Sequence, residues 1–207
     1  MLTIDLLRHG ALCGGTRYRG RCDDALTDEG RAAMDAVWHA VADSVERIIT
    51  SPLKRCRIPA TDWAKAARIP LRIDPRLEEL HYGEWEGKTM AEIAATHGAM
   101  LQQWRRDPSG MAPPGGEAME NFYQRLSDFW RQLLEKERGH VLIVGHSGVN
   151  RTLLAIALET SLATSRRMHL PYACWSRLRL RDGEVQLLFH NRRPQSPTTA
   201  CLAPPGA

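Results

Sequence analysis

The sequence predicts an α/β fold: a three-layer αβα sandwich with a mostly parallel mixed sheet and a small helical lid insertion. Short apolar runs alternate with segments of helical period, which is typical of crossover units that cover a parallel sheet. A hairpin signal near the end of the chain indicates at least one antiparallel strand. With 207 residues and 43% hydrophobic content, the chain can bury one sizeable core.

Three short apolar runs predict buried strands, at residues 2–8, 47–51 and 141–145. The third run ends at Gly145, the second ends at Ser51 before Pro52, and the first is followed by His9-Gly10. Runs of this kind are typical of buried parallel strands.

Helices are predicted between and after these strands. The segments of helical period are 28–43, 52–67, 119–137 and 149–158. Thr27 is a capping candidate for the first of them, and Asp28 and Glu29 follow in its first turn, where carboxylates are favourable.

A hairpin is predicted near the end of the chain. Residues 173–181 and 184–190 flank Asp182-Gly183, a two-residue hairpin signal, so these strands should pair antiparallel and make the sheet mixed. Residues 191–207 collect Pro, Ser, Thr and Ala without periodicity, which predicts a loosely ordered tail.

One insertion interrupts the alternation of strands and helices. Residues 81–118 contain two short helical stretches around 89–106, followed by the loop DPSGMAPPGGE. An insertion of this kind commonly covers a site. We therefore expect a single domain over residues 1–190, with a lid insertion at about 81–118.

Composition narrows the classes of function. The net charge of +4 comes from 28 basic and 24 acidic residues, without the dense Lys/Arg blocks of a nucleic-acid footprint. The five cysteines form no CxxC pair, which favours reduced thiols. We find no signal-peptide pattern and no run near the roughly 18 apolar residues of a membrane helix. We expect a cytoplasmic protein that binds a small molecule, no nucleic acid and no membrane. A homodimer stays open, because no sequence feature fixes the oligomeric state.

A histidine follows the first predicted strand. Arg8-His9-Gly10 stands at its carboxyl end, where open α/β sheets place their ligand crevice. A histidine can form a covalent intermediate, and a neighbouring guanidinium can hold phosphoryl oxygens by charge-assisted hydrogen bonds. A chance tripeptide is the alternative.

A second histidine ends another predicted strand. Gly145-His146-Ser147-Gly148 opens a helix, so a second imidazole could donate to a phosphoryl oxygen. The helix N-terminus at Ser147 would add free N–H groups and a dipole that favours an anion. The alternative is a core histidine at a strand end.

A second arginine follows the remaining strand, in the segment SPLKR (51–55). Pro52 suits the first helical position, which places Arg55 one turn in, near enough to return towards the sheet edge. Arginine suits planar phosphate recognition, although an arginine near a helix start is more often a solvated surface charge. Pro59, inside the same helix, predicts a bend or an offset.

Together these segments resemble the histidine phosphatase superfamily, also called the phosphoglycerate mutase-like family, whose pattern begins with RHG and ends with a late GH. The resemblance covers roughly residues 2–158. It rests on six ordered blocks: RHG (8–10), YRGRCDDALTDEG (18–30), SPLKR (51–55), RLEELHYGEWEG (76–87), PPGGE (113–117) and VLIVGHSGVNR (141–151).

The resemblance implies a phosphomonoesterase that carries phosphate transiently on His9. It also implies a phosphate pocket built by Arg8, Arg55 and His146. Two guanidinium groups and imidazole donors can neutralise the developing phosphoryl charge without a metal. The remaining histidines show no metal-ligand spacing such as HExxH, so we expect no metal and no cofactor.

The resemblance places the proton donor at Glu79, the second glutamate of RLEELHYG. This carboxyl would protonate the leaving alkoxide and then help to activate water. Glu78 is the rival for the role and is less favoured by register.

The chain departs from the family pattern after RHG, where the family usually has Thr and then Asn. Ala11, Leu12 and Gly15 occupy this region, so a polar contact to the phosphate is expected to be missing. Thr16, or N–H groups of the turn at residues 14–15, could replace that contact.

Within the superfamily, the short chain and its motifs resemble the alpha-ribazole phosphatases, which remove the 5′-phosphate of alpha-ribazole phosphate in assembly of the cobalamin nucleotide loop. The alternatives are a broad-specificity phosphatase, a phosphoglycerate mutase, a protein phosphatase or interaction domain that recognises phosphopeptides, and a non-catalytic phospholigand-binding module. The presence of both His9 and Glu79 argues against the last. Tyr82, Trp85 and Trp104 in the lid could stack on a base, and core packing explains such residues equally well.

Overall fold

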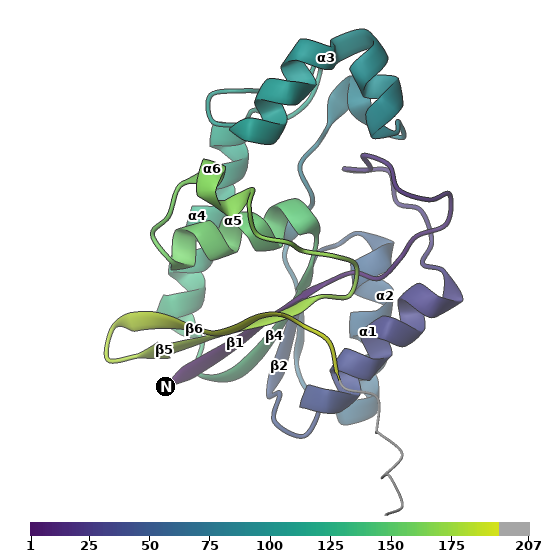
Figure 1. The fold of residues 1–207 in the computed structure, drawn as a ribbon. Helices are drawn as coiled ribbons and strands as arrows, with labels where there is room; N and C mark the ends of the chain where they lie inside the picture. The colour runs from purple at the N-terminus through teal and green to yellow at the C-terminus, as the bar shows by residue number, and fades with distance from the viewer. Residues whose placement is uncertain (195–207) are drawn as a thin grey trace, which may run out of the picture.

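The computed structural model describes residues 1–194 and confirms the predicted α/β class (Figure 1). The strands are β1 (Leu2–Arg8), β2 (Arg47–Thr50), β3 (Leu71–Ile73), β4 (Gly139–Gly145), β5 (Trp175–Arg181) and β6 (Glu184–Arg192). The α-helices are α1 (Asp28–Val41), α2 (Lys54–Ala67), α3 (Met90–Arg106), α4 (Met119–Lys136), α5 (Ser147–Ala157) and α6 (Leu162–Ser165). Two short 3₁₀ turns, Pro75–Leu77 and Gly83–Trp85, lie between β3 and α3.

The strands form one mixed sheet in the order β3-β2-β4-β1-β5-β6. The first four are parallel to one another, whereas β5 and β6 run antiparallel. Asp182 and Gly183 both have positive φ, 53° and 85°, as a tight turn between twisted strands requires. The mixed sheet and the hairpin are therefore confirmed. Strand β3 was not predicted, because three half-exposed residues give no apolar run.

Two hydrophobic clusters cover the two faces of the sheet and make the three layers. Along β4, Val141 and Ile143 pack with α4 and α5, whereas Leu142 and Val144 pack with α1 and α2. Alternate side chains of a strand point to opposite faces, so a continuous apolar run is the expected pattern for a strand covered on both sides.

The start of α1 agrees with the prediction, whereas the start of α2 does not. The Thr27 side chain accepts a hydrogen bond from the N–H of Gly30, as predicted. Pro52 is not the first helical residue, because α2 begins at Lys54. The carboxylate of Asp23 accepts the Lys54 N–H at 2.6 Å and caps the helix from a distant loop. The helix continues through Pro59.

The insertion at 81–118 contains the 3₁₀ turn Gly83–Trp85 and helix α3. In Figure 1, α3 lies at the end of the molecule farthest from the β5–β6 hairpin. His97 has non-helical dihedral angles inside α3, so two helical stretches meet there, as the sequence predicted. Trp85 and Trp104 are buried in the core, and they stabilise the insertion by packing.

The predicted tail begins too early, since β6 extends through Arg192 and pairs with Trp175 of β5. The rest of that prediction, residues 195–207, lies outside the described residues. None of the helices in the described part of the chain combines the length and apolar content that a membrane crossing requires.

A buried charge in β1 is neutralised inside the sheet. Asp5 is fully buried and accepts hydrogen bonds from Arg177 at 2.7 and 2.9 Å and contacts His140 Nε2 at 2.8 Å. Burial alone would raise the pKa of Asp5, but the bonds from Arg177 and His140 hold it below its ordinary value. These contacts of Asp5 in β1 with His140 in β4 and Arg177 in β5 link three neighbouring strands.

We predict that Asp5→Asn lowers the free energy of unfolding by about 2–4 kcal/mol at pH 7, because Arg177 loses its counter-charge inside the sheet. Urea unfolding measures this. Asp182→Asn, at an exposed turn position that also suits Asn, is the matched control and should change stability by less than about 0.5 kcal/mol. Equal stability of Asp5→Asn and the control would contradict the assignment.

Candidate active site

The two predicted histidines meet because their strands are neighbours. β1 and β4 pair in parallel, with Arg8 opposite Gly145, so His9 and His146 leave the sheet side by side. Their ring centroids are 5.3 Å apart with an edge-on geometry. The His9 N–H donates to the Gly145 carbonyl at 2.9 Å, which fixes the register beyond the end of the strand.

His9 is held with one ring nitrogen free. Its side chain is 5% exposed, and Nδ1 lies 2.9 Å from the carbonyl oxygen of Gly10. Since a carbonyl only accepts, Nδ1 carries the proton and Nε2 keeps a lone pair. Burial, and then the charges of Arg8 and Arg55, lower the pKa of His9 well below its ordinary value of 6.5. The ring is therefore neutral at pH 7.

The turn after His9 requires glycine. A Cβ on Gly10 would lie 2.0 Å from the carbonyl oxygen of Gly30 in α1. The third residue of the RHG motif thus allows α1 to pack directly against the turn that carries His9.

Arg8 is anchored beside His9. Its Nη1 donates to the carbonyl of Leu170, and its guanidinium stacks over the Tyr172 ring at 4.1 Å. The centroids of the Tyr172 and His9 rings are 5.6 Å apart. Burial lowers the pKa of Arg8, although the guanidinium remains charged at neutral pH.

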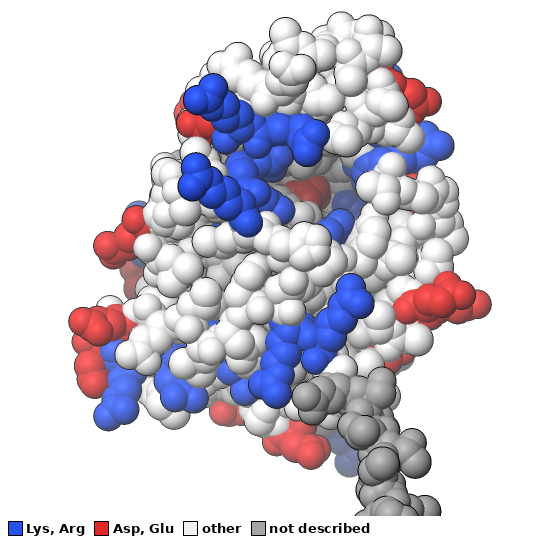
Figure 2. All heavy atoms as spheres, in the orientation of Figure 1, with Lys and Arg blue, Asp and Glu red and all other residues white. Residues whose placement is uncertain are grey.

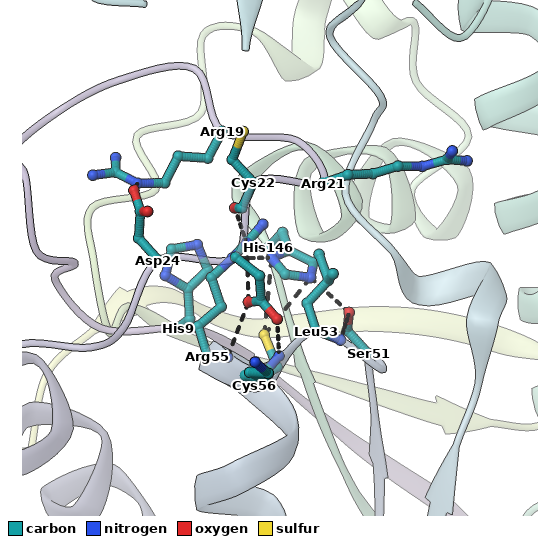
Figure 3. Close-up of polar contacts among 12 residues, drawn as sticks. His9, Arg19, Arg21, Cys22, Asp24, Ser51, Leu53, Arg55, Cys56 and His146 are labelled. Carbon is teal, nitrogen blue, oxygen red and sulfur yellow. Dashed lines mark hydrogen bonds and ion pairs between the residues drawn. The ribbon is translucent and has the colours of Figure 1, made fainter. Parts of the chain in front are cut away.

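Arg55 is almost fully buried and is held by carbonyl groups. Its Nη1 and Nη2 donate to the carbonyls of Cys22 and Gly20, both at 2.7 Å, and its Nε donates to His146 Nδ1 at 3.2 Å (Figure 3). Asp23 lies 3.4 Å from Nη1. The loop before α1 therefore fixes the direction of this guanidinium.

His146 lies behind His9, completely buried. Because its Nδ1 accepts from Arg55, Nε2 carries the proton and donates to the Ser51 hydroxyl at 2.7 Å. Burial, and then Arg55, lower the pKa of His146 well below 6.5. His146 does not line the pocket described below, so contact with a phosphoryl group would require Nε2 to exchange Ser51 for an oxygen of the ligand.

Glu79 lines the cavity described below and is held by two backbone N–H groups. Its Oε1 accepts from Leu80 at 3.1 Å, and its Oε2 accepts from Gly148, in the first turn of α5, at 2.9 Å. Glu78 instead lies 3.9 Å from Arg21, in an ion pair outside the pocket. The structure thus brings Glu79, and not its neighbour, to the site.

The segment carrying Glu79 is clamped from α4. Arg125 forms a bidentate pair with Glu117 at 2.8 and 2.9 Å and donates to the carbonyls of Arg76, Glu78 and Glu79. This contact explains the glutamate of the PPGGE block, since Glu117 aligns the arginine that holds the backbone of the RLEEL block.

These groups surround a cavity of about 330 Å³. It is lined by Arg8, His9, Leu12, Arg17, Tyr18, Arg19, Gly20, Arg55, Glu79, Tyr82, Arg105, Ser147, Arg151, Arg166 and Tyr172. Seven of these residues are arginines and one is acidic, and Lys and Arg side chains gather around the hollow in Figure 2. The cavity therefore suits an anionic ligand.

Several lining residues were not assigned a role from the sequence. Arg19 and Arg151 lie inside the motif blocks, at positions without a predicted role. Arg105, Arg166 and Tyr172 lie outside those blocks and come from α3, from the residue after α6 and from the loop before β5. Within residues 1–194, no cluster of three or more His, Cys, Asp or Glu could hold a metal ion.

Known proteins share this chain's pattern along most of its length. A bifunctional protein of Mycobacterium tuberculosis is 32% identical over 176 residues, which are 83% of this chain and 48% of that protein. The chain thus spans about half the length of this relative. An adenosylcobalamin/alpha-ribazole phosphatase of Salmonella typhimurium is 27% identical over 195 residues, 91% of this chain and 95% of the relative.

Solved structures share the fold. A mycobacterial glucosyl-3-phosphoglycerate phosphatase in complex with VO3 matches with a TM-score of 0.82 and 29% identity, over 91% of this chain and 98% of that one. The model of the histidine phosphatase superfamily (branch 1) matches residues 4–193. This match spans nearly all of the described residues, and the chain belongs to the histidine phosphatase superfamily, branch 1.

Proposed function

We propose that this protein is a metal-independent phosphomonoester hydrolase that acts through a phosphohistidine at His9. One observation carries the proposal: His9 is neutral and buried, and the bond from its Nδ1 to Gly10 leaves Nε2 as a nucleophile beside Arg8 and Arg55. A cytoplasmic location and action on a small molecule, without nucleic acid or membrane, belong to the same proposal.

The reaction follows from these positions. Nε2 of His9 forms a bond to phosphorus while the bond from phosphorus to the ester oxygen breaks, and Glu79 gives its proton to the departing alkoxide. Water then attacks the phosphohistidine, Glu79 takes a proton from that water, and inorganic phosphate leaves. Arg8 and Arg55 stabilise the phosphoryl oxygens in both steps, with the helix N-terminus at Ser147 beside them.

The substrate we propose is alpha-ribazole 5′-phosphate, in assembly of the cobalamin nucleotide loop. The similarity to the Salmonella enzyme over nearly the whole of both chains supports it. Tyr82 and Tyr172 line the cavity and offer aromatic surface to a base. Trp85 and Trp104 are buried in the core and play no part in this.

A phosphoester with a second acidic group is the other candidate, and the rim of the cavity favours it. Arg105, Arg151 and Arg166 line the cavity, and none of them pairs with a carboxylate within residues 1–194. Burial and then Arg166 lower the pKa of Arg151 to about 10. Arg166 and Arg105 also oppose the rise that burial causes in the pKa of Tyr18, which lines the same cavity.

The first test compares kcat/KM for alpha-ribazole 5′-phosphate, 3-phosphoglycerate and glycerol 3-phosphate in EDTA. 3-Phosphoglycerate has a carboxylate where glycerol 3-phosphate has a hydroxymethyl group. The ratio of their kcat/KM values therefore reports on Arg105, Arg151 and Arg166. We expect turnover in EDTA and at least about a tenfold preference for alpha-ribazole phosphate. A preference for 3-phosphoglycerate over both others would select the acidic substrate instead.

We predict that His9→Ala lowers kcat by at least about 10³-fold without changing the fold, because His9 is the only imidazole that lines the cavity within residues 1–194. Rapid quench with labelled substrate should show an acid-labile phosphoenzyme in the wild type and none in the variant. His169→Gln, an exposed histidine outside the cavity, is the control. Turnover by His9→Ala would eliminate the mechanism.

Glu79→Gln should slow substrates with poor leaving groups by about 10²- to 10⁴-fold, since the alkoxide loses its proton donor. p-Nitrophenyl phosphate, whose leaving group needs no proton, should lose much less. Glu78→Gln is the matched control. An equal loss for both types of substrate would remove Glu79 from the role of acid.

The pH profile tests the state of His9. The attacking ring must be neutral, and its pKa in the folded protein is well below 6.5. We therefore expect no loss of kcat/KM that can be assigned to His9 as the pH falls from 8 to 6.5, and an acid limb only below that value. An acid limb centred at 6.5 or above, for a substrate with a constant charge, would show that the ring is not held neutral.

A further inference from the structure

Arg19 contributes to the cavity from the loop between β1 and α1. Its side chain is 5% exposed, and it lines the same cavity as His9, Arg8 and Arg55. Its Nε donates to Asp24 at 2.7 Å and one terminal nitrogen, Nη2, donates to the Cys13 carbonyl at 2.7 Å. The guanidinium is thus held from two sides.

The other terminal nitrogen of Arg19 has no acceptor. Nη1 is buried and makes no hydrogen bond within the described part of the chain. Among the arginines that line the cavity, Arg8 is the only other one with such a nitrogen, its Nε. A buried guanidinium N–H without an acceptor is costly, and buried polar groups in folded proteins are nearly always paired. Each of these two lining arginines therefore carries a buried N–H that no acceptor within residues 1–194 satisfies.

The N–H donors of the other two phosphate-binding candidates, Arg8 and Arg55, are largely occupied by bonds within the protein. Arg55 spends bonds on Gly20, Cys22 and His146, and Nη1 of Arg8 is bonded to Leu170. A phosphoryl group has three oxygens that accept strongly, and it needs donors that the protein has not already used. Arg19 supplies one of them.

The neighbouring positions cannot take its place. Leu12 lines the cavity with an apolar side chain, Gly15 has no side chain, and Thr16 is exposed and does not line the cavity. In the loop between His9 and α1, the lining side chains that can donate to an anion are Arg17, Tyr18 and Arg19, and of these three only Arg19 is buried.

The loop is built to keep Arg19 in place. Gly20, the next residue, has φ 47°, and a Cβ there would lie 2.1 Å from Oε1 of Glu86. Glu86 accepts the N–H groups of Arg21, Cys22 and Tyr82 at 3.0–3.1 Å. The lid thus clamps the loop at the residue beside Arg19, which preorganises the guanidinium before a ligand arrives.

We propose that Arg19 is a third phosphate-binding arginine, which donates from Nη1 to the phosphoryl group alongside Arg8 and Arg55, and that Asp24 is its positioning residue. The inference rests on the proposed function, because it assigns a role in binding the same phosphoryl group. The charge of Arg19 also contributes to the lowered pKa of His9, after burial, Arg8 and Arg55.

The test measures the affinity of the folded protein for inorganic phosphate and for orthovanadate by titration calorimetry, together with kcat/KM for p-nitrophenyl phosphate. Arg19→Gln should weaken both anions by about 10- to 100-fold, the loss expected for one charge-assisted hydrogen bond to a buried group. Arg21→Gln is the matched control, two residues along the same loop. Arg21 is exposed, and Figure 3 shows it extending away from His9, Arg19 and Asp24. It should bind both anions as the wild type does.

Two further variants separate binding from a structural role. Arg19→Lys keeps the charge and loses the planar fork, so it should fall between the wild type and Arg19→Gln in anion affinity, with the acid limb of kcat/KM unmoved. Arg19→Gln should move that limb to higher pH, because one positive charge near His9 is removed. Asp24→Asn should weaken anion binding by a smaller factor than Arg19→Gln does.

Wild-type affinity for phosphate in Arg19→Gln would overturn the proposal. If that variant does not fold, wild-type affinity in Arg19→Lys would overturn it as well. Failure of the proposed function looks different: the wild-type protein would then release phosphate from no phosphomonoester, while calorimetry would still report on Arg19 through phosphate binding.

Discussion

The parallel pairing of β1 with β4 is the constraint on which the site depends. Seven residue pairs, from Leu2 with Gly139 to Arg8 with Gly145, bring two strand ends to one point. A shift of one residue would turn every side chain of β1 to the opposite face of the sheet. It would also separate His9 from His146, remove the bond from the His9 N–H to Gly145 and carry Arg8 away from Leu170. The apolar pattern of the two strands therefore specifies the site as well as the core.

The site gathers positive charge from several buried or half-buried arginines, and backbone carbonyls make this tolerable. Arg8 and Arg151 donate to carbonyl oxygens of loops or helix ends, and Arg55 donates to two such carbonyls besides its longer contact with Asp23. Carbonyl dipoles satisfy the N–H groups without cancelling the charge, as a carboxylate would. Much of the positive potential is therefore retained for a ligand.

The sequence predicts the fold class and the centre of the site for physical reasons that are local. Apolar runs and helical periods are written in contiguous residues, and His9, His146 and Ser147 stand at the strand ends that such runs define. The start of α2 could not be predicted, because its cap, Asp23, is 31 residues away from Lys54. Three further lining residues could not be predicted either, because no local pattern in the sequence shows that their segments pack together. They are Arg105, Arg166 and Tyr172, which come from α3, the end of α6 and the loop before β5. Glu79 and Glu78 are adjacent in the chain and are distinguished by what each carboxylate contacts, the first turn of α5 for Glu79 and Arg21 for Glu78.

The contact between Glu79 and the first turn of α5 also limits how this chain can change. A Cβ on Gly148 would lie 2.4 Å from Oε1 of Glu79, although nothing about the helix itself calls for glycine there. Alanine at this position would suit the helix better and would displace the carboxylate. In the mechanism proposed above, that displacement would move the proton donor while His9, Arg8 and Arg55 keep their places. The chain would then bind phosphate without turning it over, so a single methyl group would separate a phosphatase from a phosphate-binding protein.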